Sequence, residues 1–325
     1  MQIIIYPGTG GLERVRLDEV ARPAPTEHQV LVRVLAASIN ALDWRPFTMA
    51  ALMRRNGLWR PQSKPLGVDL AGRVEAVGAA VTGFRPGDAV FGVAPGAFGD
   101  YVLARDERLA LKPATVSFAA AAAVPIAGFT ALQAVRDRAN VQPGQRVLVY
   151  GASGGVGNYT VQIAKAFGAG VTAVVSPRNV ALAQQLGADE VLDYTRDDFT
   201  AGGARYDAIL AVNGYQPIGR YRRALRPGGA YVVLGGALRQ IFEAMLLGPW
   251  LGRLGGQRLS NMLARSNQPD LEALRDLLAA GKLTPVIDRT YPLAETAAAL
   301  RYVIETHAQG KVLIAPAGEA EANAA

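Results

Sequence analysis

The feature that most constrains this chain is a glycine-rich loop between an apolar segment and an amphipathic one. Residues 146–150 read RVLVY, which is typical of a buried strand, and the loop GASGGVG follows directly at 151–157. The pattern then predicts an amphipathic helix to about residue 167. A strand, a glycine loop and a helix in this order open the parallel sheets that bind dinucleotides. We therefore expect an α/β fold with a dinucleotide site at this loop.

Three positions of the loop have distinct expected roles. Ala152 stands where the chain turns tightly, Gly154 lets the backbone approach a pyrophosphate, and Gly157 lets the helix pack close to the strand. Free N–H groups and a partial positive charge at the start of the helix favour phosphate. The expected cofactor contacts of the loop are Ala152, Ser153, Gly154, Gly155, Val156 and Gly157. The alternative is a turn that binds no ligand.

The end of the next predicted strand indicates which dinucleotide binds. An NAD site usually has Asp or Glu about 20 residues beyond the loop, where it binds the ribose 2′-OH. Residues 138–188 contain no carboxylate, and the strand at 171–175 is followed by Ser176, Arg178 and Asn179. A guanidinium can donate two parallel hydrogen bonds to a phosphate. We therefore predict NADPH/NADP, with its 2′-phosphate bound by these three residues; the alternative for the arginine is a solvated loop residue.

The rest of the chain shows two kinds of pattern. Residues 1–112 read as short strands with Gly and Pro turns, which is typical of a small barrel or sandwich. Strands alternate with helices from 146 to 234, which is typical of βαβ units and a parallel sheet. Strand-like segments return at 285–288 and 311–314. The sequence therefore predicts two domains.

Composition excludes several kinds of site. The chain has no cysteine and two histidines, which excludes a disulfide scaffold, a cysteine nucleophile and a zinc site built from Cys and His. The formal charge of +7 could attract nucleic acid, anionic lipid or an anionic cofactor. No run of Lys and Arg exceeds two residues, and no nucleic-acid-binding motif accompanies the charge, so we expect no nucleic-acid partner.

One uncharged stretch, at residues 113–135, is long enough to span a bilayer. It is mostly alanine and is interrupted by Pro125 and Gly128, so the pattern predicts two buried helical pieces. We therefore expect no integral membrane association. The first residues enter a strand without a signal-peptide pattern, and a cytoplasmic location is the default expectation.

Five further motifs resemble, in the same order, those of the medium-chain dehydrogenase/reductase superfamily. They are ASINALDW at 37–44, LGVDLAG at 66–72, FRPGD at 84–88, GAFGDY at 96–101 and GKVLI at 310–314. Within that superfamily the chain is most similar to the zinc-free quinone oxidoreductase (zeta-crystallin-like) branch, which includes NADPH-dependent alkenal and enone reductases. The resemblance implies an α/β fold with a GroES-like β-barrel domain over residues 1–118, completed by 283–325, and a doubly wound six-stranded Rossmann domain over 119–282.

The same resemblance implies an activity. We expect an NADPH-dependent oxidoreductase that transfers hydride to a small-molecule substrate, either an α,β-unsaturated carbonyl compound (enone, alkenal or enoyl) or a quinone, without zinc. The alternative is a non-catalytic NADPH-binding protein with a structural or regulatory role, as the lens crystallins of this branch illustrate. Members of the branch commonly form homodimers, and the edge of a Rossmann sheet invites pairing, so we expect a homodimer.

The resemblance also assigns site residues. Asn40 and Asp43 match positions near the nicotinamide, where the amide donates to a carbonyl or positions the ring and the carboxylate orients its neighbours. The alternatives are that Asn40 caps a turn and Asp43 caps the short helix that follows. Trp44 either forms a wall of the substrate pocket or lies in the core. The further cofactor contacts implied are Tyr194, Asn213, Gly235, Gly236, His307, Ala308, Gln309 and Lys311.

Two segments keep alternative interpretations. Residues 45–64 are basic, with apolar residues interleaved, and could form a lid over the cleft, a membrane-surface contact or an ordinary solvated segment. Residues 241–251 are strongly apolar and could line a large pocket or a subunit interface.

Overall fold

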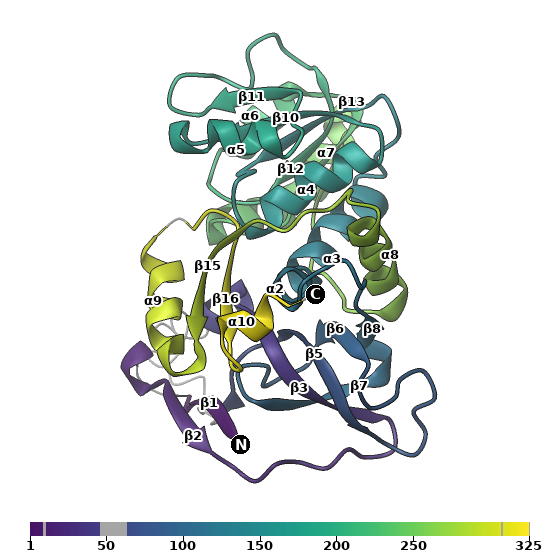
Figure 1. The fold of residues 1–325 in the computed structure, drawn as a ribbon. Coiled ribbons are helices and arrows are strands. Elements are labelled where there is room, and N and C mark those ends of the chain that lie inside the picture. Colours follow the sequence, from purple (N-terminus) through teal and green to yellow (C-terminus); the bar gives the residue numbers. More distant parts are fainter. Residues whose placement is uncertain (9–10, 46–63, 307, 325) are drawn as a thin grey trace. The chain divides into compact units, whose positions relative to one another are not determined.

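The computed structural model describes residues 1–8, 11–45, 64–306 and 308–324. The chain divides into two compact units, each described here by itself (Figure 1). Unit 1 comprises Met1–Ile126, Ser266–Gly281 and Pro285–Ala325, and unit 2 comprises Ala127–Arg265 and Lys282–Thr284. Unit 1 extends beyond the expected boundary at residue 118 because helix α2 (Phe118–Ala122) packs on several of its strands. It also includes Ser266–Gly281, because helix α8 (Gln268–Ala279) packs on another strand of the unit.

Unit 1 is built around a seven-stranded sheet. Its order is β15-β16-β3-β5-β6-β8, and β7 also pairs with β3. The strands are β3 (Gln29–Ser38), β5 (Asp69–Val77), β6 (Ala89–Val93), β7 (Tyr101–Arg105), β8 (Leu109–Leu111), β15 (Ile287–Pro292) and β16 (Lys311–Ala315). Leu313 of β16 lies opposite Ser38 of β3, so a strand from the end of the chain completes the sheet of the amino-terminal part.

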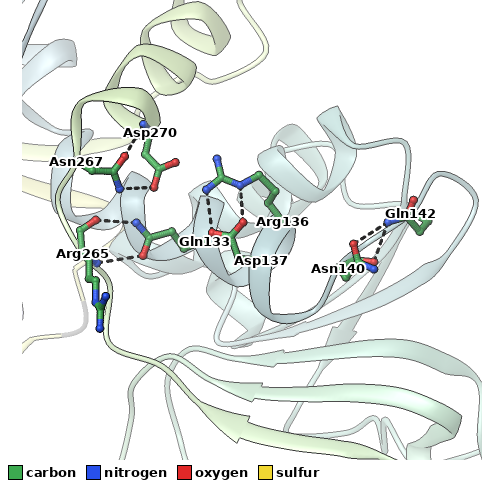
Figure 2. A network of polar contacts seen from close by, with 8 residues as sticks. All are labelled: Gln133, Arg136, Asp137, Asn140, Gln142, Arg265, Asn267 and Asp270. Atoms are coloured by element: carbon green, nitrogen blue, oxygen red, sulfur yellow. Dashed lines mark hydrogen bonds and ion pairs between the residues drawn. The ribbon is translucent and has the colours of Figure 1, made fainter.

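A smaller sheet and short helices complete unit 1. Strand β1 (Gln2–Tyr6) pairs antiparallel with β2 (Arg16–Glu19) and with β4 (Lys64–Pro65). Helix α9 is Thr296–Glu305 and α10 is Glu319–Ala322. Figure 2 shows how α8 begins: the Asn267 side chain accepts from the Asp270 backbone N–H at 2.9 Å, which satisfies one of the free donors of the first turn.

Unit 2 contains a six-stranded sheet in which every pair is parallel, in the order β11-β10-β9-β12-β13-β14. The strands are β9 (Arg146–Tyr150), β10 (Gly170–Val175), β11 (Glu190–Asp193), β12 (Tyr206–Ala211), β13 (Leu225–Val233) and β14 (Arg258–Asn261). The central strands are continuously apolar because helices cover both faces. The strand order reverses between β9 and β12, which is the doubly wound Rossmann arrangement. The predicted fold class is confirmed.

The helices of unit 2 follow the strands as right-handed crossovers require. Helices α4 (Gly155–Ala166) and α5 (Val180–Gln185) cover one face of the sheet, and α6 (Ile218–Ala224) and α7 (Leu238–Gly255) cover the other (Figure 1). The loop after β14 is fastened to the end of α3 (Pro125–Gln133), because the Gln133 amide donates to the Arg265 carbonyl at 2.7 Å and accepts from its N–H at 3.1 Å (Figure 2).

The uncharged stretch at 113–135 forms the two separate helices α2 and α3, and Pro125 begins the second of them. Both helices bury alanine and phenylalanine side chains. Among the described residues, no helix combines the length and the apolar character needed to cross a membrane.

Gly157 is placed where a side chain would collide with the loop before it. A Cβ atom built on this residue would lie 2.2 Å from the Gly151 carbonyl oxygen. Helix α4 can therefore begin this close to β9 only with glycine at position 157. Gly154 differs, since a Cβ atom there would come no nearer than 3.9 Å to that same oxygen.

These two glycines give a matched test of the packing. Overpacking costs about 1–3 kcal/mol, which corresponds to a fall in melting temperature of about 2–12 °C, and this is the expected effect of Gly157→Ala. The control, Gly154→Ala, introduces the same methyl group into open space and should change the melting temperature by less than about 2 °C. Calorimetry of both variants measures this, and equal melting temperatures would contradict the packing role.

Candidate functional site

Three loops meet at the carboxyl edge of the sheet in unit 2. A Cβ atom on Gly151, after β9, would lie 2.9 Å from the backbone nitrogen of Asn213, after β12. A Cβ atom on Gly236, after β13, would lie 2.7 Å from the Gly214 carbonyl oxygen. Gly151, Gly214 and Gly236 all have a positive φ that favours glycine. The loops therefore form one continuous backbone surface where the strand order reverses, which is where open α/β sheets bind their ligands.

The glycine loop keeps free space beside Gly154, as noted above, and α4 starts at the next residue. The Asn158 side chain donates to the Gly154 carbonyl oxygen at 3.2 Å and so fixes the loop to the first turn of the helix. Ala152 is buried, whereas Ser153, Gly155 and Val156 are half-buried. The loop thus leaves accessible backbone beside the start of the helix, which suits a diphosphate.

The three residues predicted for the 2′-phosphate lie in and before a short turn. Ser176 follows β10 and is half-buried, and Arg178 is exposed in the 3-10 turn Pro177–Asn179. Asn179 is 5% exposed, and its side-chain nitrogen donates to Ser176 Oγ at 2.9 Å and to Ser153 Oγ at 2.8 Å. The amide nitrogen of Asn179 therefore donates its hydrogen bonds to two serines and is not directed at a ligand.

A carboxylate that lies outside residues 138–188 is brought close to the end of β10 by the neighbouring strand, β11. Asp193 ends β11 and is paired in register with Val175, the last residue of β10. Its carboxylate accepts from the Thr195 N–H at 2.9 Å and hydroxyl at 2.8 Å, and it pairs with Arg196 at 3.2 Å. The Thr195 backbone hydrogen bond is the main reason that the pKa of Asp193 lies below its usual value. This carboxylate is engaged within its own loop, and Tyr194 beside it is 55% exposed.

Unit 1 contains a buried polar cluster at the ends of three strands. Ser38 ends β3 and Asn40 follows it, Asp69 begins β5, and Lys311 begins β16; Asp43 completes the cluster. The Asp69 carboxylate accepts from the Ser38 hydroxyl at 2.9 Å and from the Asn40 amide at 2.8 Å. Lys311 Nζ donates to Asn40 Oδ1 at 2.6 Å and lies 3.6 Å from Asp69 Oδ2.

These contacts hold the Asn40 side chain in one orientation. Its nitrogen donates both to Asp69 and, at 3.3 Å, to the Ser38 carbonyl oxygen, while its oxygen accepts from Lys311. Both donors of the amide are thus engaged within unit 1. Donation to a substrate carbonyl, the predicted role, would replace the longer bond to Ser38.

Asp43 closes the start of the helix at residues 41–45. Its carboxylate accepts from the Asn40 backbone N–H at 2.7 Å, and its own N–H donates to the Asn40 carbonyl oxygen at 3.0 Å. A side chain in the first turn that reaches back in this way to the N-cap residue, here Asn40, forms one half of a capping box. The capping alternative stated for Asp43 therefore describes its contacts.

Burial determines how the cluster titrates. Loss of water and, to a smaller extent, the nearby Asp69 charge raise the pKa of Asp43 to about 7, against the hydrogen bond from the Asn40 N–H. Burial also raises the pKa of Asp69 and lowers the pKa of Lys311, and the attraction between these two groups opposes both effects. With a proton on Asp43, the cluster contains one cation and one anion and is neutral.

The remaining predicted residues fall into both units. Asn213, Gly235 and Gly236 lie in the loops of unit 2 described above. In unit 1, Gln309 is half-buried, and its N–H donates to Asp288 at 2.7 Å. Ala308 and Trp44 pack against the core of unit 1, and Lys311 is 3% exposed within the polar cluster. His307 lies outside the described residues, as does the segment at 46–63 with its three interpretations.

The described residues offer no group of three or more His, Cys, Asp or Glu side chains that could hold a metal ion. The chain has no cysteine at all, and the side chain of His28 is mostly exposed on a turn of unit 1. The residues present therefore do not fit the zinc sites built from Cys and His. Activity without zinc remains a prediction.

Comparisons with known proteins agree with this geometry. Residues 26–114 match the family described as alcohol dehydrogenase GroES-like domain, and residues 186–314 match the family described as zinc-binding dehydrogenase. The chain is 32% identical to the chloroplast envelope quinone oxidoreductase homolog of Arabidopsis thaliana, over 95% of each chain. It is 31% identical to the chloroplastic NADPH-dependent alkenal/one oxidoreductase of the same plant, over 97% of this chain and 80% of that protein.

The fold is also found among solved structures. The quinone oxidoreductase of Coxiella burnetii superposes with a TM-score of 0.84 and is 28% identical, over 97% of this chain and 99% of that one. These names correct one expectation. Relatives similar over almost the whole chain are named for the chloroplast, so the default of a cytoplasmic location is wrong.

The names of these relatives all describe catalysts, and they give no support to a non-catalytic role. The two family matches fall in different parts of the chain, at residues 26–114 and 186–314, and the similarity to the chloroplast envelope homolog covers 95% of the chain. The chain belongs to the medium-chain dehydrogenase/reductase superfamily and is an oxidoreductase of its quinone and enone reductase branch.

Proposed function

We propose that this protein uses NADPH to reduce an α,β-unsaturated carbonyl compound or a quinone, without zinc. The observation that carries the proposal is the glycine-loop surface at the switch point of unit 2, in a chain 31% identical to an NADPH-dependent alkenal/one oxidoreductase. A nicotinamide cofactor bound there would supply the hydride. The backbone N–H groups of the loop and of the first turn of α4 bind and orient its diphosphate.

An α,β-unsaturated carbonyl substrate gains a hydride from the cofactor at the β-carbon and then a proton from water or a side chain at the α-carbon. Between these two events negative charge collects on the carbonyl oxygen, and a fixed hydrogen-bond donor stabilises it. Asn40 is our candidate for this donor or for positioning the nicotinamide, because Lys311 and Asp69 already hold its amide in a single orientation. Donation to the substrate would require the amide to exchange only its longer bond, to the Ser38 carbonyl oxygen, while Asp69 and Lys311 keep holding it.

The choice of NADPH rests on residues in the loops after β9 and β10. The hydroxyls of Ser153 and Ser176 and the guanidinium of Arg178 can all donate to a phosphate. The nearby carboxylate, Asp193, is engaged with Thr195 and Arg196 and does not offer an acceptor to a bare ribose hydroxyl. Hydrogen bonds to a charged group contribute about 1.5–3 kcal/mol, or about ten- to a hundredfold in affinity.

Steady-state oxidation of the cofactor tests the activity and the cofactor choice together. The enzyme is treated with a chelator and assayed with a panel of enones, alkenals and quinones, with NADPH and then with NADH. We expect turnover with NADPH at a kcat/KM about tenfold or more above that with NADH, and no loss after chelation. Tight NADPH binding without turnover of any substrate would favour the non-catalytic alternative, and loss of activity with bound zinc would contradict the zinc-free proposal.

We propose that Asp43 is a structural acid that carries a proton near neutral pH. Its pKa in the folded chain is about 7, well above the ordinary value of 3.8 for an aspartate, because the side chain is buried. Its contribution to stability is therefore complete below pH 4 and is lost as pH rises through 7. The free energy of unfolding should fall over this range by at most about 1.4 kcal/mol per pH unit.

Denaturation in urea between pH 4 and pH 8 measures this contribution. The difference between the wild type and Asp43→Asn should shrink as pH rises, because the amide variant does not lose a proton. Glu19→Gln, at an exposed acid of β2, is the control and should follow the wild type at every pH. A difference that stays constant with pH would show that Asp43 is ionised throughout.

We propose that the protein is a homodimer joined through the edge of the unit 2 sheet. Among the described strands, β14 pairs with β13 alone, so its outer edge presents backbone groups that a second copy could pair. The helix before it, α7, carries exposed apolar side chains spaced mainly by four residues. They are Leu238, Phe242, Met245, Leu246, Leu247 and Trp250. Of the two interpretations of residues 241–251, this exposure favours the interface.

Light scattering at micromolar concentration tests the dimer. We expect a mass of twice 34.3 kDa for the wild type. Leu246→Glu combined with Trp250→Glu should shift it to 34.3 kDa, because charges are costly in an apolar interface. Leu17→Glu, at an exposed leucine of β2, should leave the dimer intact. A wild-type mass of 34.3 kDa across this range would refute the proposal.

A further inference from the structure

The side chain of Asn179 joins two loops that follow adjacent strands. Ser153 belongs to the glycine loop after β9, and Ser176 follows β10. The Asn179 nitrogen lies 2.8 Å from the first hydroxyl and 2.9 Å from the second. Asn179 is itself 5% exposed, and both serines are half-buried. The serines are therefore more accessible to a ligand than the amide that holds them.

The chemistry of these groups determines where the hydroxyl hydrogens can go. An amide nitrogen has two hydrogens and no lone pair available, so it donates in both of these bonds. Each serine hydroxyl consequently accepts from Asn179 and keeps its own single hydrogen for another partner. The two bonds thus leave two O–H donors, one on each loop, to be shared with whatever binds there.

We propose that Asn179 is a positioning residue for the 2′-phosphate of NADPH: it aims the hydroxyls of Ser153 and Ser176 at the phosphate and does not itself contact it. This inference rests on the proposed function and replaces the expectation that the Asn179 amide meets the ligand directly. Near neutral pH a phosphate monoester carries at most one proton, so nearly all of its oxygens can only accept hydrogen bonds. It therefore matches a site that presents hydrogen-bond donors. A ribose 2′-OH brings its own hydrogen and gains less from such a site.

The alternative is direct contact between Asn179 and the phosphate, and a double-mutant cycle separates the two. A positioning residue acts through the serines, so removing the serines removes its effect as well. A residue that contacts the phosphate keeps its effect when the serines are absent. Arg178, which we expect to contact the phosphate directly, provides the reference for this second behaviour.

Calorimetric titration with adenosine 2′,5′-bisphosphate measures binding without turnover, and 5′-AMP is the matched probe without a 2′-phosphate. Asn179→Ala should weaken the bisphosphate about tenfold, the value of one or two hydrogen bonds to a charged group, and change 5′-AMP less than about twofold. In Ser153→Ala with Ser176→Ala, adding Asn179→Ala should change bisphosphate binding by less than about twofold. Arg178→Ala should weaken the bisphosphate in both backgrounds.

Two results would overturn the inference. One is an undiminished effect of Asn179→Ala in the background without serines, which would assign the contact to the asparagine itself. The other is an equal loss for both probes, which would mean that Asn179 only maintains the loops. If the double serine variant does not fold, a double-mutant cycle of Asn179→Ala with Ser176→Ala takes its place. The combined loss of bisphosphate affinity should then be smaller than the sum of the two single losses. Failure of the wild type to prefer the bisphosphate over 5′-AMP would instead count against the proposed cofactor.

Discussion

The carboxylate of Asp69 is the group on which unit 1 depends most. It is completely buried, and an unpaired charge in such a position costs several kcal/mol. Its partners are Ser38 and Asn40 from the end of β3, Lys311 from β16 and the backbone N–H of Ile126. They come from distant parts of the sequence, so the carboxylate is satisfied only when the unit is assembled. The same bonds orient the Asn40 amide, so the stability of the barrel and the geometry of the candidate site cannot be changed separately.

Much of the fold could be predicted because its signals are local. The RVLVY strand, the glycine loop and the amphipathic helix lie within about twenty consecutive residues, and the structure places them as β9, the loop and α4. The collision of a Cβ atom at Gly157 explains in steric terms a role that spacing alone had indicated. The return of strands near the end of the chain was also visible, and motifs along the whole chain identified the superfamily.

Side-chain partners could not be predicted in the same way. Asp193 lies outside the interval searched for an acid, and only the pairing of β10 with β11 brings it beside Val175. Asn179 has the polarity expected of a ligand contact. The direction in which its side chain points, however, depends on the positions of two serines in the loops after separate strands. The apolar run at 241–251 has the same pattern whether it faces a pocket or the surface. The location in the cell was a default with no physical signal in the sequence behind it.

The pairing of β16 with β3 determines the order in which the chain can be completed during synthesis. Leu313 and Ser38 are adjacent in the sheet but 275 residues apart in sequence (313 minus 38), and the strands of unit 2 all lie between them. Domains fold as they emerge from the ribosome, so the Rossmann sheet, complete by Asn261, can form while β3 still lacks one neighbour. Unit 1 closes last, when Lys311 arrives as the cation for Asp69. A chain that stops before β16 would retain the dinucleotide fold and leave a buried carboxylate without its counter-charge.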